Sequence, residues 1–569
     1  MINRRKALKI LSTIPVGGML AGRANGLTNP ALWGEESGQT GPLTYGSEIY
    51  ESIGVDPVIN CRGTFTIIGG SVHRPEVEQA MAAAAQNYVQ MDELADGVGR
   101  RLAELTGAEW GMVSSGCAGA MKHATAACVA GGNPEKLTRI PDMTGLDKTE
   151  VVVPRPWRNN YDHAIRNIGV KVITVETQEE LARALNPKTA MVYLCTYGSS
   201  YNEGEPFSIK PVADIVRPHN IPILVDAAAE ELSVRPNIHL EGGATLVAYS
   251  GGKCIRGPQC AGLLLGNKKL IMSAWQASSP HHGPGRDNKV GREETLGMLA
   301  AVEAWVKRDP EAEWQTWISY LETIANRVSG IDTVQTQIME SEGYRPQAGK
   351  TFSGWPDGAN LNNRSPRLVI SWDPDRLNMT GDELADFVAR NRPKIALGAG
   401  SSRGASIADN ATAINITSFQ MRPSDDKVVA DRLYEILTAD RSPRSDRMAS
   451  PGANLTGRWE VDVEFFSSES RHTFFLEQDN NWLQGAHKGD FSMRDIAGTI
   501  EGNEVKLMSV ERRPGNSIRF IFAGRLSGDT ITGDVYMGEY LNAKFTARAH
   551  SYGDQRREVD VPTGHPMTN

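Results

Sequence analysis

The residues with the clearest chemical potential lie in one glycine-rich segment, SGGKCIRGPQCAGLLLG, at positions 250–266. Lys253 stands there between two apolar runs, GATLVAY before it and AGLLLG after it, which both have the composition of buried strands. An amine held at the end of a buried strand loses part of its hydration, and this loss favours the neutral, nucleophilic form. The segment therefore predicts a lysine that forms a Schiff base with a carbonyl compound.

Three further features point to related chemistry. Asp226 ends the run IPILVD, and a carboxylate at the carboxyl end of a central parallel strand faces the ligand crevice. The segment SSGCAGA, residues 114–120, lies between a predicted strand and a predicted helix, where backbone N–H groups and the helix dipole bind a phosphate. Ser250 and Arg256 flank Lys253 and can reach the same phosphate. Together they predict pyridoxal phosphate, with its aldehyde on Lys253 and its pyridine nitrogen on Asp226.

Each of these features also has a structural explanation. Asp226 alone could cap a helix, a short glycine turn alone is a weak signal, and Lys253 alone could be a solvated turn residue. Their occurrence together, in this order on one chain, favours the cofactor site.

The surrounding elements predict an α/β fold followed by an all-β domain. From residue 46 to residue 300, strand-like and helix-like runs alternate, which indicates a largely parallel sheet with helices on both faces. A smaller α+β domain is predicted over residues 301–440, and a polar linker follows at 441–455. Residues 456–552 alternate apolar and polar positions between short turns, as in a small antiparallel meander or barrel. No catalytic residues stand out in this last region, so a docking or stabilising role is the preferred interpretation.

Several segments between residues 46 and 303 carry a resemblance to a known family. They are VINCRGTFTIIGGS, YVQMDELADGVGRRLAELTGAEWGMVSSGCAGAM, RNNYDHAIRNIG, VDAAAE, SGGKCIRGPQCAGLLLG and KVGREE. The chain resembles the family that contains bacterial selenocysteine synthase and D-glucosaminate-6-phosphate ammonia lyase, which are pyridoxal phosphate enzymes of the aspartate aminotransferase fold (fold type I). The resemblance implies that Lys253 is the Schiff-base lysine, that Asp226 is the partner of the pyridine nitrogen, and that Ser115, Gly116 and Cys117 hold the phosphate.

The chain departs from this family in two places. Family members often carry RGHRN where this chain has RPWRN at residues 155–159, so Trp157 stands where a histidine is expected over the cofactor ring. Tryptophan can stack there but cannot shuttle a proton. Selenocysteine synthase carries an extra N-terminal domain for its tRNA, whereas the stretch before the segment INCRG in this sequence holds an apparent signal and a Gly-rich stretch.

The resemblance implies a lyase that acts on an amino acid or an amino-sugar acid. Removal of the Cα proton, loss of a β-hydroxyl and release of ammonia would leave a 2-oxo acid. Selenium transfer to seryl-tRNA, amino-acid racemisation and a non-enzymatic role as an exported binding protein with a relic fold remain alternatives. Arg158, Arg286 and Lys289 are candidate ligands of a substrate carboxylate or phosphate, although each alone is typical of a surface charge.

The first 26 residues, MINRRKALKILSTIPVGGMLAGRANG, predict export. The pair Arg4 and Arg5, a short apolar run and small residues occur in the order of a twin-arginine signal, so a periplasmic or secreted location is expected. A plain amphipathic helix is the alternative. The apolar run is too short for a comfortable membrane span, so no stable membrane anchor is expected.

The composition narrows the range of partners. A net charge of −8 and a pI near 5.9 argue against a general nucleic-acid-binding protein. The six cysteines show no C-x-x-C spacing and predict neither a disulfide framework nor a metal site. A small amino substrate is the expected ligand. The family's fold implies a homodimer or a higher homo-oligomer, and residues 64–71 and 278–291 are the candidate interface segments.

Overall fold

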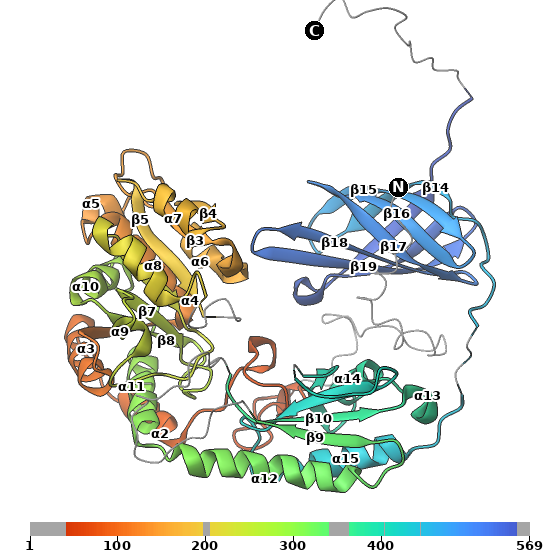
Figure 1. The fold of residues 1–569 in the computed structure, drawn as a ribbon, viewed down its shortest axis with the longest axis horizontal. Coiled ribbons are helices and arrows are strands. Elements are labelled where there is room, and N and C mark those ends of the chain that lie inside the picture. Colours follow the sequence, from red (N-terminus) through yellow and green to blue (C-terminus); the bar gives the residue numbers. More distant parts are fainter. Residues whose placement is uncertain are drawn as a thin grey trace, which may run out of the picture. The chain divides into compact units, whose positions relative to one another are not determined.

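The computed structural model describes residues 41–196, 205–340, 363–402, 404–443, 445 and 447–554. The predicted export signal at residues 1–26 lies outside these ranges. Contacts within the chain separate the described residues into one unit that ends at residue 443 and a second that starts at residue 445. The first unit holds the mixed α/β elements and the second is all-β (Figure 1).

Within the described residues, seven strands form the large sheet of the first unit, in the order β2-β8-β7-β6-β5-β3-β4. Their bounds are β2 (Trp110–Ser115), β3 (Glu150–Pro154), β4 (Lys171–Val175), β5 (Thr189–Cys195), β6 (Ile223–Asp226), β7 (Leu246–Ser250) and β8 (Ala261–Gly266). Adjacent strands from β7 to β4 are parallel, as the alternating pattern predicts. β3, β5, β6 and β7 are buried along nearly their whole length, because helices cover the sheet, whereas the edge strand β4 is mostly half-buried.

β8 differs from the predicted parallel arrangement, because it runs antiparallel to both of its neighbours, β7 and β2. Only residues 251–260 connect β7 to β8, and they contain no helix. A parallel crossover needs about a dozen residues or more, so this short connection can join the two strands only as antiparallel neighbours.

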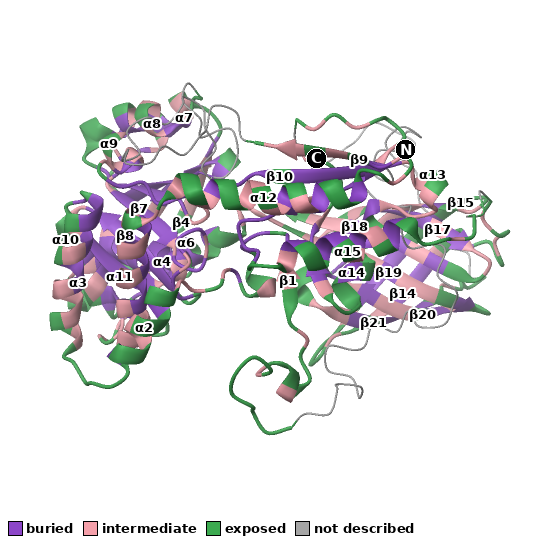
Figure 2. Ribbon diagram, turned by 90° about the horizontal axis from the view of Figure 1, so that it is seen from below, coloured by how far each residue is buried: buried purple, intermediate pink, exposed green. Residues whose placement is uncertain are grey.

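Helices pack on this sheet and bring one helix N-terminus to its edge. α4 (Gly116–Ala130) follows β2 directly and packs against β7 and β8, and Figure 2 shows these elements largely buried. The other helices of this part are α2 (Pro75–Ala84), α3 (Met91–Thr106), α5 (Pro134–Leu137), α6 (His163–Arg166), α7 (Gln178–Ala184), α8 (Ile209–Val216), α9 (Ile238–Glu241), α10 (Lys268–Ala277) and α11 (Arg292–Lys307).

The long helix α12 (Pro310–Val328) leads from the large sheet to a smaller α+β region in the same unit. An antiparallel sheet in the order β12-β13-β10-β9 forms its centre. Its elements are β9 (Gln335–Met339), β10 (Arg367–Trp372), α13 (Pro374–Leu377), α14 (Gly381–Arg390), β12 (Gly398–Ala399), β13 (Thr412–Thr417) and α15 (Asp425–Thr438). The N-terminal strand β1 (Val58–Asn60) pairs in parallel with β11 (Lys394–Ala396), which ties the start of the described chain to this region.

The second unit is a closed antiparallel barrel. The sequence had left a meander and a barrel as alternatives, and the structure shows the barrel. The strands are β14 (Gly457–Glu464), β15 (Glu469–Asp479), β16 (Trp482–Lys488), β17 (Met493–Glu501), β18 (Glu504–Arg513), β19 (Asn516–Ser527), β20 (Thr530–Tyr536) and β21 (Asn542–Ala549). Each strand pairs with the next, and β14 also pairs with β21, so the barrel has no open edge. Inward-pointing side chains such as Phe474, Phe522 and Val535 fill its apolar core.

None of the helices among the described residues is long and apolar enough to cross a bilayer. The described residues also contain no group of three or more His, Cys, Asp and Glu side chains arranged to hold a metal ion.

Candidate active site

Asp226 is the last residue of β6, and only 4% of it is exposed. Its Oδ1 accepts hydrogen bonds from the Cys117 thiol at 3.3 Å and from the Ala228 backbone N–H at 3.0 Å. Its Oδ2 accepts a hydrogen bond from the Tyr193 hydroxyl at 2.8 Å. A buried carboxylate is costly unless hydrogen bonds compensate its charge, and here donors from α4, β5 and the loop after β6 supply them.

Two of these three donors are themselves titratable, and both stay protonated. Burial, followed by the Asp226 carboxylate, raises the pKa of the Tyr193 phenol well above its ordinary value. Burial and Asp226 likewise raise the pKa of the Cys117 thiol well above its ordinary value. Both groups therefore remain hydrogen donors to Asp226 across the physiological pH range.

The start of α4 has the properties of an anion site. Gly116 takes φ +64°, a left-handed conformation that favours glycine, and Ser115 precedes it without making a side-chain cap. The first turn contains no acidic residue, so its N–H groups and the helix dipole favour a bound anion. Gly262 in β8 permits this arrangement, because a Cβ there would lie 2.4–2.7 Å from backbone atoms of Gly116 and Cys117.

Lys253 lies on the tight connection between β7 and β8. The Gly251 N–H donates to the Ala261 carbonyl at 2.8 Å, and the Gly257 N–H donates to the Gly251 carbonyl at 2.9 Å, so both ends of this loop are fixed. Lys253 is partly buried, and its positive charge acts on the Cys117 thiol against the effect of Asp226. Cys117 thus bonds directly to Asp226 and also lies within the electrostatic reach of Lys253, although the three residues come from separate segments of the sequence.

Trp157 ends a single 3₁₀ turn that follows β3 directly, and it is 1% exposed. The Asn159 side-chain amide donates to the Trp157 carbonyl at 3.2 Å and also contacts the Tyr193 hydroxyl. This contact connects the Trp157 segment to the residues that surround Asp226. Trp157 places a large planar ring at this end of the sheet. Its stacking against a cofactor ring remains a prediction.

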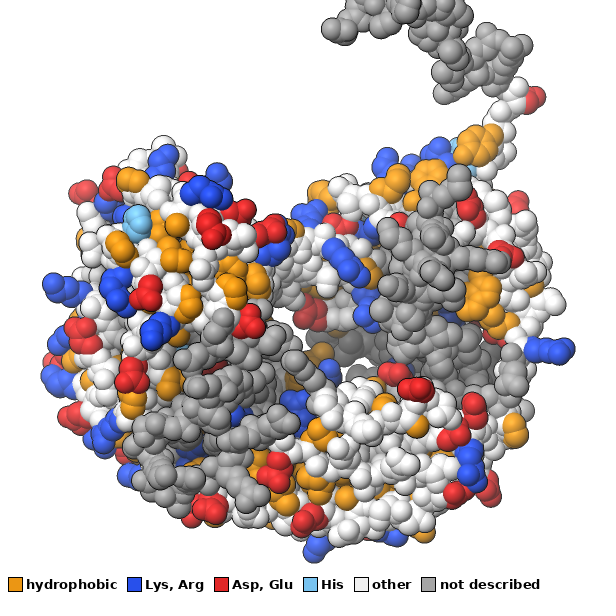
Figure 3. All heavy atoms as spheres, in the orientation of Figure 1, with side chains coloured by type: hydrophobic (Ala, Val, Ile, Leu, Met, Phe, Trp, Pro, Cys, Tyr) orange, Lys and Arg blue, Asp and Glu red, His pale blue; other side chains and the backbone are white. Residues whose placement is uncertain are grey.

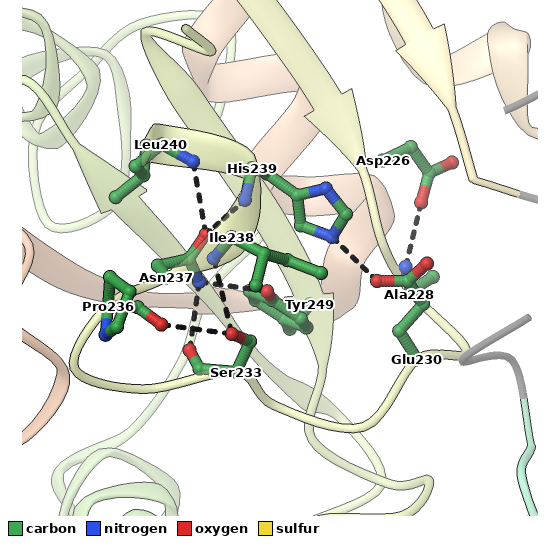
Figure 4. Close-up of polar contacts among 10 residues, drawn as sticks. All are labelled: Asp226, Ala228, Glu230, Ser233, Pro236, Asn237, Ile238, His239, Leu240 and Tyr249. Atoms are coloured by element: carbon green, nitrogen blue, oxygen red, sulfur yellow. Dashed lines mark hydrogen bonds and ion pairs between the residues drawn. The ribbon is translucent and has the colours of Figure 1, made fainter. Parts of the chain in front are cut away.

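A buried polar network holds the loop that follows Asp226 (Figure 4). The Asn237 side chain donates to the Ser233 carbonyl at 3.0 Å and to the Tyr249 hydroxyl at 2.9 Å. His239 Nε2 lies 2.6 Å from a carboxylate oxygen of Glu230. Because Tyr249 belongs to β7, just before the Lys253 loop, these bonds couple the position of the Asp226 loop to that of the lysine.

The structure gives other contacts to several residues that the sequence placed at the phosphate or at the substrate. Ser250 ends β7, and its N–H donates to the Ala228 carbonyl at 3.4 Å. Arg256 Nε donates to the Val72 carbonyl at 2.9 Å, and Arg158 pairs with the buried Asp162 at 2.6 Å. These contacts leave the cofactor role of Ser250 and Arg256 a prediction and give Arg158 a structural partner.

The two remaining candidates, Arg286 and Lys289, are exposed side chains on residues 278–291. The neighbouring Asp287 pairs with the buried Lys122 of α4 at 2.7 Å and so attaches this segment to the helix. Arg286 donates to the Ser279 hydroxyl at 3.0 Å. These contacts do not direct Arg286 or Lys289 toward Asp226, and their predicted role in binding an acidic group of the substrate stays a prediction.

Sequence reasoning missed Tyr193, Asn159 and the side-chain role of Cys117. The position of Tyr193 in the run AMVYLC indicates a buried hydroxyl that needs a hydrogen-bond partner, but it does not indicate which partner. Also missed was a cavity of about 250 Å³ between the large sheet and the smaller α+β region. Its charged lining is Arg74, Arg256, Arg308, Arg364 and Arg422, together with Glu231 and Glu313.

The comparisons with known proteins agree with this geometry. No protein-family model matches the chain. It is 30% identical over 306 residues to D-glucosaminate-6-phosphate ammonia lyase of Salmonella typhimurium, an alignment that covers 52% of this chain and 79% of that enzyme. It is 28% identical over 358 residues to 5'-C-glycyluridine monooxygenase-decarboxylase of a Streptomyces species, over 61% of this chain and 83% of that enzyme.

A solved structure of a D-glucosaminate-6-phosphate ammonia-lyase superposes with a TM-score of 0.57 at 25% identity, over 68% of this chain and 98% of that one. Fold, site and relatives define a pyridoxal phosphate-dependent enzyme of fold type I. The chain belongs to the family of D-glucosaminate-6-phosphate ammonia lyase. The predicted family, fold class and cofactor are thereby confirmed.

The residues at this site fit pyridoxal phosphate. A carboxylate offers about four acceptor positions, and the described donors to Asp226 use three of them, which leaves one on Oδ2 for a protonated pyridine nitrogen. The N-terminus of α4 and the Lys253 amine supply the anion site and the nucleophile that the other two groups of the cofactor require.

Tyr193→Phe is expected to weaken cofactor binding, because it removes the donor to the Oδ2 atom of Asp226. The free energy of unfolding should fall by about 1–3 kcal/mol, the usual cost of leaving a buried group without its hydrogen bond. Absorbance titration with pyridoxal phosphate should give a Kd raised severalfold. Chemical denaturation measures the change in the free energy of unfolding.

Thr106→Val is the matched control, since it removes an equally buried hydroxyl in α3, which donates to the Leu102 carbonyl at 2.7 Å instead of to Asp226. It should cost similar stability and leave cofactor affinity unchanged. Equal losses of affinity in both variants would contradict a specific role of Tyr193.

Proposed function

We propose that this enzyme is a lyase that releases ammonia from an amino acid or an amino-sugar acid. The arrangement that carries the proposal is the convergence of Lys253, Asp226 and the α4 N-terminus on one edge of the sheet. The relationship to an ammonia lyase named for an amino-sugar acid, which aligns over 79% of that enzyme, supports the reaction type. The proposed substrate class is a 2-amino acid with a hydroxyl on the β-carbon.

Bound pyridoxal phosphate supplies an electron sink for the carbanion that forms at Cα of the substrate. Asp226 would hold the proton on the pyridine nitrogen, and the buried Tyr193 and Cys117 donors keep its carboxylate in place. Backbone N–H groups of Ser115, Gly116 and Cys117 would bind the phosphate. Lys253 Nζ would bind the cofactor aldehyde and then, once displaced by the substrate amine, accept the Cα proton.

The later part of the reaction depends on where the removed proton goes. Departure of the β-hydroxyl, followed by hydrolysis of the resulting enamine, yields ammonia and a 2-oxo acid. Return of the proton to the opposite face of Cα would instead give racemisation and requires a second acid there. Trp157 has no titratable proton to supply, so elimination is favoured over racemisation.

The arginine-lined cavity is the proposed site for an acidic group of the substrate. Its lining carries five arginines against two glutamates, and Arg74 and Arg308 both contact Glu313. The net positive charge attracts a carboxylate or a phosphate. Cys254 and Arg256, which flank the Lys253 position, form part of the same lining, so this charge lies next to the lysine loop.

The two other functions suggested by the sequence are less well supported. Selenium transfer would require binding of a seryl-tRNA, yet the chain carries a net charge of −8. On the face drawn in Figure 3, Lys and Arg side chains are interspersed with Asp and Glu. A relic fold would have no need for three separate donors to the buried Asp226 side chain.

Lys253→Ala is expected to abolish the covalent link to pyridoxal phosphate, because no other amine would be held at this position. Borohydride reduction followed by peptide mass mapping should find the reduced cofactor on Lys253 in the parent protein and nowhere in the variant. The parent should release ammonia and a 2-oxo acid from D-glucosaminate-6-phosphate or another β-hydroxy amino acid, and the variant should lose this activity by several orders of magnitude.

Lys269→Ala, which changes an exposed lysine of α10, should retain both the link and the activity. A reduced adduct on another lysine would refute the assignment of Lys253. A normal link without ammonia release from any amino acid tested would refute the lyase and keep the cofactor site.

The enzyme is further proposed to be a homodimer whose interface includes residues 64–71. Phe65 and Ile67 of this segment are 45% and 77% exposed, and Val72, which follows it directly, is 51% exposed. Exposed apolar side chains that gather in one patch mark interaction surfaces. Light scattering on the cofactor-loaded protein should give twice the chain mass, and Ile67→Lys should shift the equilibrium toward monomer. Val428→Lys, a similarly exposed position on α15, should not; a monomeric parent enzyme would refute the dimer.

Export through the twin-arginine route is proposed from the pair Arg4 and Arg5. This route accepts folded cargo, which suits an enzyme that binds its cofactor before export. Replacing both arginines with lysine should retain the protein in the cytoplasm, as cell fractionation would show. Unchanged recovery from the periplasm would count against this route.

A further inference from the structure

One end of the barrel interior contains polar side chains where the remainder is apolar. His472 in β15 and His487 in β16 point inward and are 2% and 0% exposed. Arg494 in β17 and Ser509 in β18 complete the group. An interior of this size is normally filled by apolar side chains, so the histidines call for an explanation that packing does not give.

The hydrogen bonds among these residues have one direction. A guanidinium can only donate, so Arg494 Nε, at 3.2 Å, donates to Nδ1 of His487. The His487 hydrogen therefore sits on Nε2, which donates to Nδ1 of His472 at 2.9 Å. His472 in turn carries its hydrogen on Nε2. Burial, followed by Arg494, lowers the pKa of His487 to about 2, and burial also lowers the pKa of His472, so both rings are neutral.

The chain of donors ends on the Nε2–H group of His472, which has no acceptor within 3.5 Å among the described residues. His472 Nε2 is fully buried, and the nearest carboxylate oxygen, Oδ2 of Asp490, lies 3.6 Å away, beyond hydrogen-bonding distance. Oδ1 of Asn516 is a second buried polar atom without a partner among these residues. Buried polar atoms of native proteins are almost always paired, so these two atoms are the groups of the barrel that a polar ligand would bond.

His472 and Asn516 both line one cavity of about 280 Å³. Phe465, Ile518 and Phe520 give it an apolar wall. A concave site with mostly apolar walls and a few polar groups is the usual form of a small-molecule site, and the mouth of an eight-stranded barrel is a usual place for one.

The charges around the cavity compensate one another. Glu511 accepts from Arg494 at 2.5 Å and pairs with Arg513 at 3.3 Å, and Asp490 supplies the second negative charge. With both histidines neutral, two arginines face two carboxylates. A ligand with a net charge would find no surplus of opposite charge here.

Ser509 and His487 do not form a hydrolytic pair. The Ser509 hydroxyl lies 2.7 Å from His487 Nδ1, but Ser509 is 2% exposed and does not line the cavity. A substrate in the cavity would therefore not reach this hydroxyl, and the group suits binding rather than catalysis.

We propose that the C-terminal barrel binds an uncharged, flat, amide-like small molecule in this cavity, with the ligand carbonyl accepting from His472 Nε2–H and a ligand N–H donating to Asn516. The apolar body of the molecule would lie against Phe465, Ile518 and Phe520. This binding site is independent of the lyase activity and of its cofactor.

The test uses the full-length protein and the neutral fluorescent ketone prodan, whose emission shifts to the blue in an apolar site. Saturable, blue-shifted binding with one site per chain is expected. The bicyclic lactam 2-quinolone, which carries adjacent C=O and N–H groups, should displace the dye at least about fivefold more strongly than naphthalene, which has the same frame without polar atoms. Equal displacement by both compounds would overturn the proposed polar recognition.

Four variants locate the site. Asn516→Leu and His472→Phe should each weaken the binding of 2-quinolone about fivefold, which is the effect of losing one neutral hydrogen bond. Ser517→Trp fills the cavity from an exposed position and should abolish dye binding. Phe475→Ala, on the outer face of the same strand as His472, should leave binding unchanged.

The pattern across the variants decides the outcome. Dye binding that survives Ser517→Trp, or falls equally in Phe475→Ala, would place the dye outside the cavity and overturn the proposal, as would absence of saturable binding to the parent. Should His472→Phe unfold, shown by loss of its thermal transition, Asn516→Leu and Ser517→Trp still decide the question. Ammonia release by the parent is a separate measurement, so failure of one proposal does not affect the other.

Discussion

The rest of the catalytic unit is organised around one buried negative charge, the Asp226 carboxylate. A carboxylate with 4% exposure is stable in the interior only if several donors point at it. Those donors are the Cys117 thiol, the Tyr193 phenol and the Ala228 N–H, and they come from three different elements. The relative placement of α4, β5 and β6 is therefore part of the electrostatics of the site as well as of its packing.

This constraint explains why small residues occur where the elements meet. α4 reaches Asp226 only because its N-terminus lies directly on β8, and that approach leaves no room for a side chain at Gly262. The helix that supplies the Cys117 donor also presents the N–H groups proposed to hold the phosphate. One close backbone contact thus serves both ends of the cofactor site.

The sequence predicted the parts of this arrangement that are local. Lys253, Asp226 and the turn at residues 114–120 each follow a recognisable apolar run. Residues at the carboxyl ends of parallel strands meet at one edge of the sheet, so their common location could be predicted. Tyr193 and Asn159 escaped because their role depends on which strands become neighbours. A tyrosine inside a buried strand has the same local pattern whether its hydroxyl meets a carboxylate or a backbone carbonyl.

Arg256 was predicted beside the phosphate from its distance to Lys253 along the chain. The turn between them takes the backbone through φ +58° at Arg256 and directs its guanidinium to the Val72 carbonyl. Spacing along a loop does not fix side-chain direction, because one residue in a left-handed conformation reverses it. The antiparallel direction of β8, in contrast, was implicit in the short connection of residues 251–260 and could have been inferred from its length.

The buried polar groups of the barrel differ from those of the catalytic unit in what they leave for a ligand: a donor in the barrel and an acceptor at Asp226. Around Asp226 the described donors leave one acceptor position, which the known cofactor fits. In the barrel, the hydrogen bonds from Arg494 through His487 leave one donor on His472, whose nearest carboxylate, that of Asp490, lies 3.6 Å away. His472 and His487 looked ordinary in the sequence because an inward histidine keeps the period of two of a strand. Their role becomes visible only in the folded barrel, where β15 lies beside β16. Arg494 fixes which nitrogen of His487 carries the hydrogen, and His487 in turn fixes this for His472, at the wall of the cavity.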